Sequence, residues 1–333
     1  MIDLKEKLYQ MFILGTEGDE YKKALKQGLG GIIFFTKDIQ TKDQFKSLIN
    51  EIKSESLIPP FLSIDQEGGR VERTENIHNG KKYLSAKFAY QKGLPFLEEQ
   101  TKEIAQELKD YGVNLNFAPC IDTNTNPNNP IIGERAFSSN PNEVIEGEKI
   151  VSDIYSKYGI IPCVKHFPGH GDASTDSHLT LPEINLSMQE MEQSHIKPFK
   201  YAVENGIDMI MVAHLHCTCF EKETIPTSLS KNAINYLRKT LNFNGVIISD
   251  DMIMKGVAKF GETESALMAI KAGINLLIYR NSKQNTIQII NNIYNIAKKD
   301  EELTQKINLS YNKIIELKNK YYITMSEGLN ENK

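Results

Sequence analysis

The sequence predicts an α/β protein built as a single (β/α)8 TIM-type barrel. Eight short apolar runs recur along the 333 residues, helical patterns separate them, and polar residues gather where the runs end. The runs are mostly continuous rather than alternating, which is typical of parallel strands covered on both faces. They occupy residues 10–15, 30–35, 60–65, 114–119, 161–167, 209–215, 245–250 and 274–279.

The segments between these runs show helical periodicity. Leu97, Ile104 and Leu108 recur at about 3.6-residue spacing, and Gly112 follows where a C-terminal cap is expected. Strand and helix therefore alternate along the chain, as a barrel of eight βα units requires. Similar helical segments occupy residues 41–55, 143–158, 187–205, 229–240, 262–272 and 284–298.

The composition of the chain indicates how many domains it has and in which cellular compartment it works. No linker-like stretch divides the chain, so we expect one barrel domain over residues 1–325 and a disordered tail over residues 326–333. The apolar run near the N-terminus is too short for a secretory leader, and no stretch reaches the ~20 apolar residues of a membrane span. The four cysteines lack CxxC spacing and are expected to be reduced thiols. A cytoplasmic monomer is predicted.

The charge balance narrows the class of partner. The formal net charge is −4 and the pI is near 6.0, which argues against nucleic acid or an anionic membrane as the main partner. Small or neutral ligands are favoured, and no cofactor and no metal are expected.

Polar side chains follow six of the apolar runs. In a barrel of this kind, the reactive groups lie where strands end and the following loops begin. A purely structural arrangement would scatter polar residues between both strand ends, so the one-sided placement predicts a binding or catalytic site. These residues are Asp65, Asp122, Lys165, His166, His214, His216, Asp250, Asp251, Tyr279 and Arg280.

Three loops that follow strands are unusually long, at about residues 66–95, 120–141 and 168–186. The first opens with DQEGGRVER, in which two adjacent glycines permit close backbone approach and Arg70 and Arg73 offer planar donor forks. Each arginine is a candidate either for ligand binding or for a loop-anchoring ion pair, with Arg73 the stronger candidate for binding.

The stretch KHFPGHGDASTDSH, residues 165–178, concentrates polar and helix-breaking residues. His166 and His170 are four residues apart, but Pro168 intervenes, so they are not expected to share a helical face as in a zinc site. We expect instead a mobile polar loop with Gly169 and Gly171 as possible pivots.

Within this loop, Asp176 stands two residues before His178. An aspartate so placed can orient an imidazole by accepting one ring N–H, which leaves the other nitrogen free to exchange a proton. The pair is a candidate general acid/base.

Asp250 is the candidate nucleophile, because the run GVIISDD would hold its carboxylate at the rigid end of a buried strand. Side chains alternate along a strand, so Asp251 would point elsewhere. Two other interpretations stay open: Asp250 caps the following segment, or Lys165 is a Schiff-base lysine of a barrel aldolase. The second lacks a Gly-rich phosphate loop near the last two strands.

Four motifs resemble glycoside hydrolase family 3, and within it the single-domain bacterial β-N-acetylglucosaminidases of peptidoglycan recycling. The motifs are SIDQEGGRVER, IIGERAF, KHFPGHGDASTDSHLTLP and GVIISDDMIMKG. They run in the family's order, and the similarity covers about residues 5–320. KHFPGHG followed by DSH is the most specific of them.

The resemblance implies that Asp250 is the nucleophile and that His178 is the acid/base, with Asp176 as its partner. It implies a retaining, exo-acting β-N-acetylglucosaminidase whose substrate is a small carbohydrate such as an anhydro-muropeptide. Relatives often complete their sites with a second domain, whereas here we expect the proton donor to come from the loop 168–186. Matching positions that hold the non-reducing N-acetylglucosamine are Asp65, Arg73, Arg135, Lys165 and His166.

Two rival functions remain at this stage. One is a metal-dependent barrel hydrolase that uses His166, His214, His216 and an aspartate. The other is a non-catalytic sugar-binding protein on the same barrel.

Overall fold

Eight parallel strands close into a barrel in this computed structural model, which describes residues 2–174 and 181–324. The predicted (β/α)8 fold is confirmed, and each strand falls on one of the eight predicted runs. Around the barrel the order is β1-β2-β3-β4-β5-β7-β9-β10, and β10 pairs with β1. The strands are β1 (Phe12–Glu17), β2 (Gly31–Phe34), β3 (Phe61–Ile64), β4 (Leu115–Asn116), β5 (Ile161–Phe167), β7 (Met209–Val212), β9 (Val246–Asp251) and β10 (Leu276–Asn281).

Burial explains why the apolar runs are continuous. All seven residues of β5 are buried, because one face fills the barrel interior and the other lies under the surrounding helices. The register is tight at Gly31, which pairs with Ile13 of β1 and Phe61 of β3. A Cβ atom at Gly31 would lie 2.8 Å from the Phe61 carbonyl oxygen, so this position excludes larger residues.

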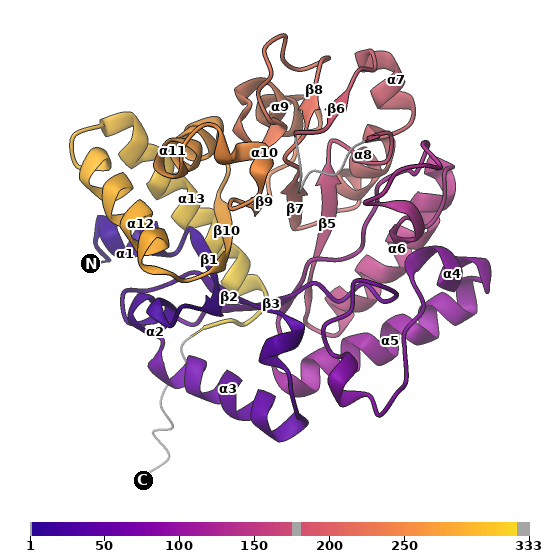
Figure 1. Cartoon of the computed structure of the whole chain (residues 1–333), viewed down its shortest axis with the longest axis horizontal. Helices are drawn as coiled ribbons and strands as arrows, with labels where there is room; N and C mark the ends of the chain where they lie inside the picture. Colours follow the sequence, from indigo (N-terminus) through magenta and orange to yellow (C-terminus); the bar gives the residue numbers. More distant parts are fainter. Residues whose placement is uncertain (1, 175–180, 325–333) are drawn as a thin grey trace.

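Helices surround the barrel (Figure 1). Those that follow the predicted segments are α3 (Lys42–Glu55), α5 (Leu94–Tyr111), α6 (Pro141–Lys157), α11 (Glu262–Ala272) and α12 (Gln284–Ala297). Gly112 ends α5 as predicted, with φ +83° and its amide donating to the carbonyls of Leu108 and Lys109.

Two predicted helices are each split into two pieces. Residues 187–205 form α7 (Met188–Gln193) and α8 (Ile196–Glu204), and residues 229–240 form α9 (Lys231–Asn235) followed by a π-helical turn at Tyr236–Thr240. No described helix is long and apolar enough to cross a membrane. The predicted tail, residues 326–333, lies outside the described residues.

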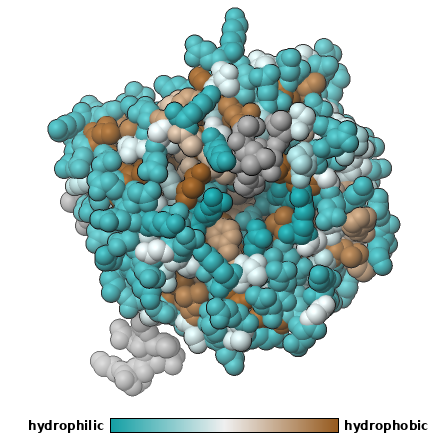
Figure 2. Space-filling model, viewed as in Figure 1, coloured by the Kyte–Doolittle hydropathy of each residue, from teal (hydrophilic) through white to brown (hydrophobic). Residues whose placement is uncertain are grey.

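Several elements were not predicted. They are α1 (Leu4–Tyr9), α2 (Glu20–Leu25), α4 (Ala86–Gln91), α10 (Lys255–Ala258), α13 (Glu301–Lys320), and a small parallel pair formed by β6 (Glu183–Ile184) and β8 (His216–Cys217). The face of the molecule seen in Figure 2 is mainly hydrophilic, with apolar residues in small separate groups.

Candidate active site

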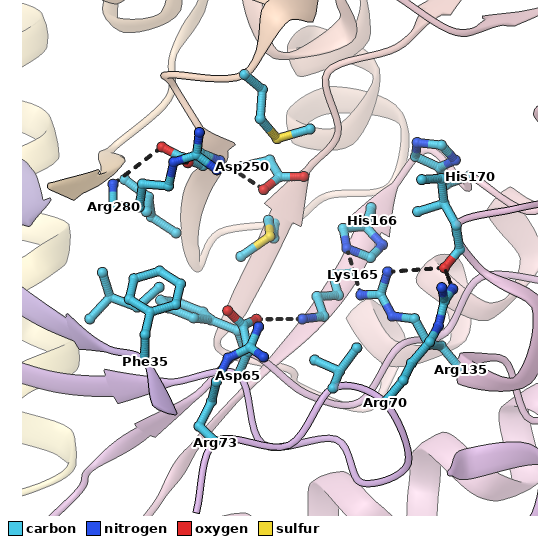
Figure 3. A pocket seen from close by; sticks show the side chains of 18 of the residues that line it. Phe35, Asp65, Arg70, Arg73, Arg135, Lys165, His166, His170, Asp250 and Arg280 are labelled. Carbon is cyan, nitrogen blue, oxygen red and sulfur yellow. Dashed lines mark hydrogen bonds and ion pairs between the residues drawn. The ribbon is translucent and has the colours of Figure 1, made fainter. Parts of the chain in front are cut away.

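A cavity of about 360 Å³ opens at the C-terminal ends of the strands. Its walls come from segments far apart in the sequence, which the barrel brings together (Figure 3). Of the eight residues with a predicted catalytic or sugar-binding role, the six that the structure describes all line this cavity: Asp65, Arg73, Arg135, Lys165, His166 and Asp250. The other two, Asp176 and His178, lie outside the described residues.

Lys165, on β5, joins two carboxylates beside the cavity. Its Nζ lies 2.7 Å from Asp65 Oδ1 and 2.7 Å from Glu67 Oε1. Glu67 also accepts two hydrogen bonds from Arg135, at 2.9 Å from Nε and 2.7 Å from Nη2. The four side chains therefore form one paired network of buried and half-buried charges.

These pairs decide the ionisation of the network. Burial disfavours the Lys165 cation, yet Asp65 and Glu67 raise the pKa of Lys165 above its ordinary value. Burial likewise disfavours the Glu67 anion, but Arg135 and Lys165 hold the pKa of Glu67 well below its usual range. Lys165 and Glu67 are thus both charged at neutral pH.

Asp122 fixes the orientation of His166. Its Nδ1 lies 2.7 Å from Asp122 Oδ2, and its backbone amide donates to the same carboxylate at 3.2 Å. The other ring nitrogen makes a longer contact, 3.4 Å, with Arg135 Nη2. A guanidinium only donates, so His166 accepts through Nε2 and donates through Nδ1. Burial opposes ionisation of Asp122, but His166 holds the pKa of that carboxyl well below its usual range.

Asp250 lies at the end of β9 and faces the cavity beside His166 (Figure 3). The Asp251 amide donates to Asp250 Oδ1 at 2.7 Å. Burial alone would raise the pKa of Asp250, but His166, His214 and that amide outweigh it and lower the pKa below its ordinary value. Asp250 is therefore an ionised carboxylate in a mostly buried position.

Asp251 lines the same cavity as Asp250, so the expectation that it points elsewhere is not met, and Arg280 of β10 holds its carboxylate. Its Oδ1 accepts the Arg280 amide at 3.2 Å, and its Oδ2 lies 3.3 Å from Arg280 Nε. The next helix, α10, begins after Met254 at its N-cap, so Asp250 does not cap it. The capping interpretation of Asp250 is wrong.

The two arginines of the glycine-rich loop after β3 make different contacts. Gly68 has φ +93° and Gly69 has φ +61°, and a Cβ at either would collide with residues 84–85. Arg70 donates to the backbone carbonyls of Pro130, at 3.2 Å, and Ile131, so it ties the first long loop to the second. Arg70 and Arg73 both line the cavity, and the Arg73 guanidinium lies 5.7 Å from the ring centroid of Phe35.

The residues 3–317 match the profile of the "Glycosyl hydrolase family 3 N terminal domain". The chain belongs to glycoside hydrolase family 3. It is 32% identical over 303 residues to "Beta-hexosaminidase" of Haemophilus influenzae, which covers 88% of this chain and 82% of the relative. It is also 31% identical over 272 residues to "Beta-hexosaminidase A" of Pseudoalteromonas piscicida, of which it spans 45% of the length.

Two solved structures have the same fold as this chain. A β-N-acetylglucosaminidase from Paenibacillus sp. FPU-7 superposes with a TM-score of 0.88 at 29% identity, over 98% of this chain and 65% of that one. A β-N-acetylhexosaminidase from Beutenbergia cavernae has a TM-score of 0.88 at 19% identity, over 95% of this chain and 98% of that one. The chain is a glycoside hydrolase of family 3.

The metal-dependent alternative requires three histidines to converge, and they do not. His214 lies 2.6 Å from Ser228 Oγ through Nδ1 and 3.1 Å from the Asp251 carbonyl through Nε2. His216 lies between Glu183 and the Glu221 carbonyl in the small β6–β8 sheet. Both ring nitrogens of each histidine are therefore occupied by protein groups.

One compact group among the described residues has metal-like spacing, namely Cys120, Asp122 and His166. Its members already satisfy one another, because the Cys120 thiol lies 3.2 Å and His166 Nδ1 2.7 Å from Asp122 Oδ2. The Arg135 guanidinium beside His166 further disfavours a second cation there.

The aldolase interpretation of Lys165 also fails on charge. A Schiff-base lysine needs a neutral amine, which requires a lowered pKa. The two carboxylates shift the pKa of Lys165 in the opposite direction.

Sequence reasoning missed Glu67, included Asp122 only among the polar residues at strand ends, and gave no binding role to His170. Glu67 lies in DQEGGRVER, two residues after the predicted Asp65, but the sequence does not indicate that it pairs with Lys165 and Arg135. The expected pivots Gly169 and Gly171 are tightly packed, since a Cβ on them would collide with His195 and with the Thr123 carbonyl.

Proposed function

We propose that this family 3 hydrolase is a retaining β-N-acetylglucosaminidase that removes non-reducing terminal N-acetylglucosamine. The observation that carries the proposal is the ionised Asp250 carboxylate, held at the end of β9 in a cavity lined by both charged and apolar side chains. Such a carboxylate suits nucleophilic attack on an anomeric carbon. The names of the bacterial β-hexosaminidase relatives support the choice of sugar.

In the proposed mechanism, an Asp250 oxygen attacks the anomeric carbon while the bond to the leaving oxygen breaks. Protonated His178, oriented by Asp176, gives its proton to that leaving oxygen. Neutral His178 then takes a proton from water, whose oxygen attacks the same carbon and releases Asp250. Two displacements retain the configuration. A histidine suits this role because its ordinary pKa, about 6.5, makes both protonation states available near neutral pH.

We assign sugar binding to the remaining predicted residues. Asp65, Lys165 and Arg135 present a pre-paired set of donors and acceptors. Lys165 pairs with Asp65, and Glu67 links Lys165 to Arg135, so the orientation of all three is fixed without ligand. His166 and Arg73 complete the set from neighbouring segments of the cavity wall. Pre-organisation of this kind lowers the entropic cost of binding a flexible, hydroxyl-rich ligand.

The finer proposal is that the substrate is an anhydro-muropeptide in cytoplasmic peptidoglycan recycling. It is supported by the motif resemblance to single-domain bacterial enzymes of that process. Comparison of kcat/KM for N-acetylglucosaminyl-anhydromuramic acid and for chitobiose tests it. Preference for chitobiose would reject the muropeptide while leaving the sugar assignment intact.

The first test addresses the nucleophile and the sugar together. Wild type should cleave an aryl β-N-acetylglucosaminide far faster than an aryl β-glucoside, with retention seen by NMR. Asp250→Asn should lower kcat/KM by on the order of 10³-fold or more, with unchanged folding by circular dichroism. Asp43→Asn, at an exposed position on α3, is the matched control. Turnover by Asp250→Asn near the wild-type rate would reject the assignment, and absence of wild-type turnover on every glycoside would favour a sugar-binding protein.

The second test addresses the acid/base. His178→Ala should lose about 10²–10⁴-fold on a sugar leaving group but much less on a nitrophenyl leaving group, because only the former needs protonation. The ratio of kcat/KM values for the two substrates is the measurement. Equal losses on both would count against the role of His178.

A further inference from the structure

His170 is a buried histidine that the proposed mechanism leaves without a role. It is 3% exposed and lines the same cavity as Asp250 and His166. Figure 3 places it on the side of the cavity where His166 and Arg135 lie. Neither of its ring nitrogens has a hydrogen-bond partner within residues 2–174 and 181–324.

The backbone of His170 is fixed from both sides. Its amide donates to Asp122 Oδ1 at 2.6 Å, and its carbonyl accepts from Asn129 Nδ2 at 2.8 Å. The flanking Gly169 and Gly171 are packed so closely that no side chain could replace either hydrogen. The imidazole is therefore presented from a rigid backbone, which is the arrangement expected of a pre-organised binding group.

An unpartnered buried imidazole is costly to keep. Each buried polar atom without a partner destabilises the fold, because it has lost its hydrogen bonds to water without replacement. His166, whose ring centroid is 6.1 Å away, has both nitrogens engaged, so the contrast lies within one wall of the cavity. A ligand in the cavity would supply the missing partners.

We propose that His170 is a substrate-binding residue whose two ring nitrogens contact hydroxyl groups of the non-reducing sugar. This inference rests on the proposed function and adds to it a specificity-determining contact. A neutral imidazole has one N–H donor and one acceptor nitrogen, and a hydroxyl group serves as partner to either. A carboxylate or phosphate only accepts, so it would leave the second nitrogen unsatisfied.

The charge state of the ring also favours a neutral partner. Burial lowers the pKa of His170 to about 4, which keeps the ring neutral at physiological pH.

The test combines His170 variants with deoxygenated substrates. His170→Leu should lower kcat/KM for an aryl β-N-acetylglucosaminide by about 10–100-fold. For a 3-, 4- or 6-deoxy analogue that lacks a contacted hydroxyl, the fold-difference between wild type and variant should be clearly smaller than on the parent, since part of the interaction is already lost. His170→Gln, which keeps a donor and an acceptor, should recover part of the activity and gives a second variant where Leu impairs folding.

Each outcome decides the matter. An equal fold-loss on the parent and all deoxy analogues would overturn the contact and make His170 structural. A loss seen only with sugar leaving groups would overturn it in favour of a role in acid/base positioning. Wild-type cleavage of glucosides rather than N-acetylglucosaminides would reject the proposed function, while the same series on the aryl glucoside would still test His170.

Discussion

Two lysines are almost completely buried in this barrel, at opposite ends of the strands. Lys165 is 2% exposed at the C-terminal end, where the cavity opens, and Lys318 is 1% exposed at the N-terminal end. Lys165 lies 2.7 Å from each of two carboxylates, Asp65 and Glu67. Its charge is therefore compensated, and the pKa is raised above its ordinary value.

Lys318 meets only neutral oxygens. Its Nζ donates to Gln10 Oε1 at 2.8 Å and to the Pro59 carbonyl at 2.7 Å, and the ring centroid of Phe61 is 4.8 Å away. Burial lowers its pKa to about 7. The lysine thereby links α13 to the segments that lead into β1 and β3, and Gln10 in turn donates to the Gly28 carbonyl before β2.

The contrast assigns Lys165 to function and Lys318 to stability. In barrels of this type the active site occupies the C-terminal end, and the N-terminal end mainly supports the fold. Lys165 is paired with carboxylates, so it stays charged and can orient a ligand. Lys318 has no carboxylate partner, and it serves as a hydrogen-bond donor that joins segments at the N-terminal end of the barrel. Substitutions at the two ends should accordingly have different consequences.

The largest effect is expected for Lys165→Met. The change removes a proposed sugar contact and leaves Asp65 and Glu67 without their shared cation, so kcat/KM should fall by on the order of 10³-fold. Stability in urea should fall by about 3–5 kcal/mol, since one partner of a buried network is lost. Lys318→Met is the control at the other end and should keep kcat/KM within about 3-fold. The reverse pattern would refute the division of roles.

The eight strands could be predicted because burial on both faces leaves continuous apolar runs. The helix α13 was missed although Leu303, Ile307, Ile314 and Leu317 show the required periodicity. The two-residue strands β6 and β8 are too short for any periodic pattern.

The site could be predicted as a set of residues but not as a network. The position of Lys165 at the end of an apolar run marked it as functional. That Glu67 bridges Lys165 and Arg135 depends on segments about 70 to 100 residues apart, whose contact only the closed barrel defines. The same limit applies to Lys318 and Gln10, which are 308 residues apart.

A smaller effect is expected for Glu67→Gln. An amide has one acceptor oxygen and two donor hydrogens, so it cannot accept from Lys165 and from both nitrogens of Arg135. We expect kcat/KM to fall by about 10²-fold and the unfolding free energy by about 3 kcal/mol, because Asp65 still pairs with Lys165. Glu98→Gln, in an exposed pair with Lys102, is the matched control and should change neither quantity measurably. Wild-type kinetics in Glu67→Gln would show that the network does not orient the sugar-binding groups.

The smallest effect concerns the pH dependence of stability. The pKa of Lys318 in the folded state, about 7, is below the unfolded value of about 10.4, so between these values the unfolded chain binds more protons. The unfolding free energy of wild type should therefore rise with pH relative to Lys318→Met across this window, by on the order of 1 kcal/mol per pH unit. Below pH 7 the lysine is charged in both states and the difference should be constant.

For Lys165, at the C-terminal end of the strands, no pH dependence of stability is expected over the same window. Lys165→Met is therefore the comparison for Lys318→Met. The raised pKa of Lys165 means that its contribution is fully present below its unfolded pKa and declines only at higher pH. The difference between wild type and Lys165→Met should stay flat from pH 7 to 10 in urea titrations. Lys306→Met, on α13 with no ion pair among the described side chains, controls for general loss of a lysine. A flat profile for Lys318→Met as well would mean that the Gln10 and Pro59 oxygens hold a charged lysine at the barrel floor.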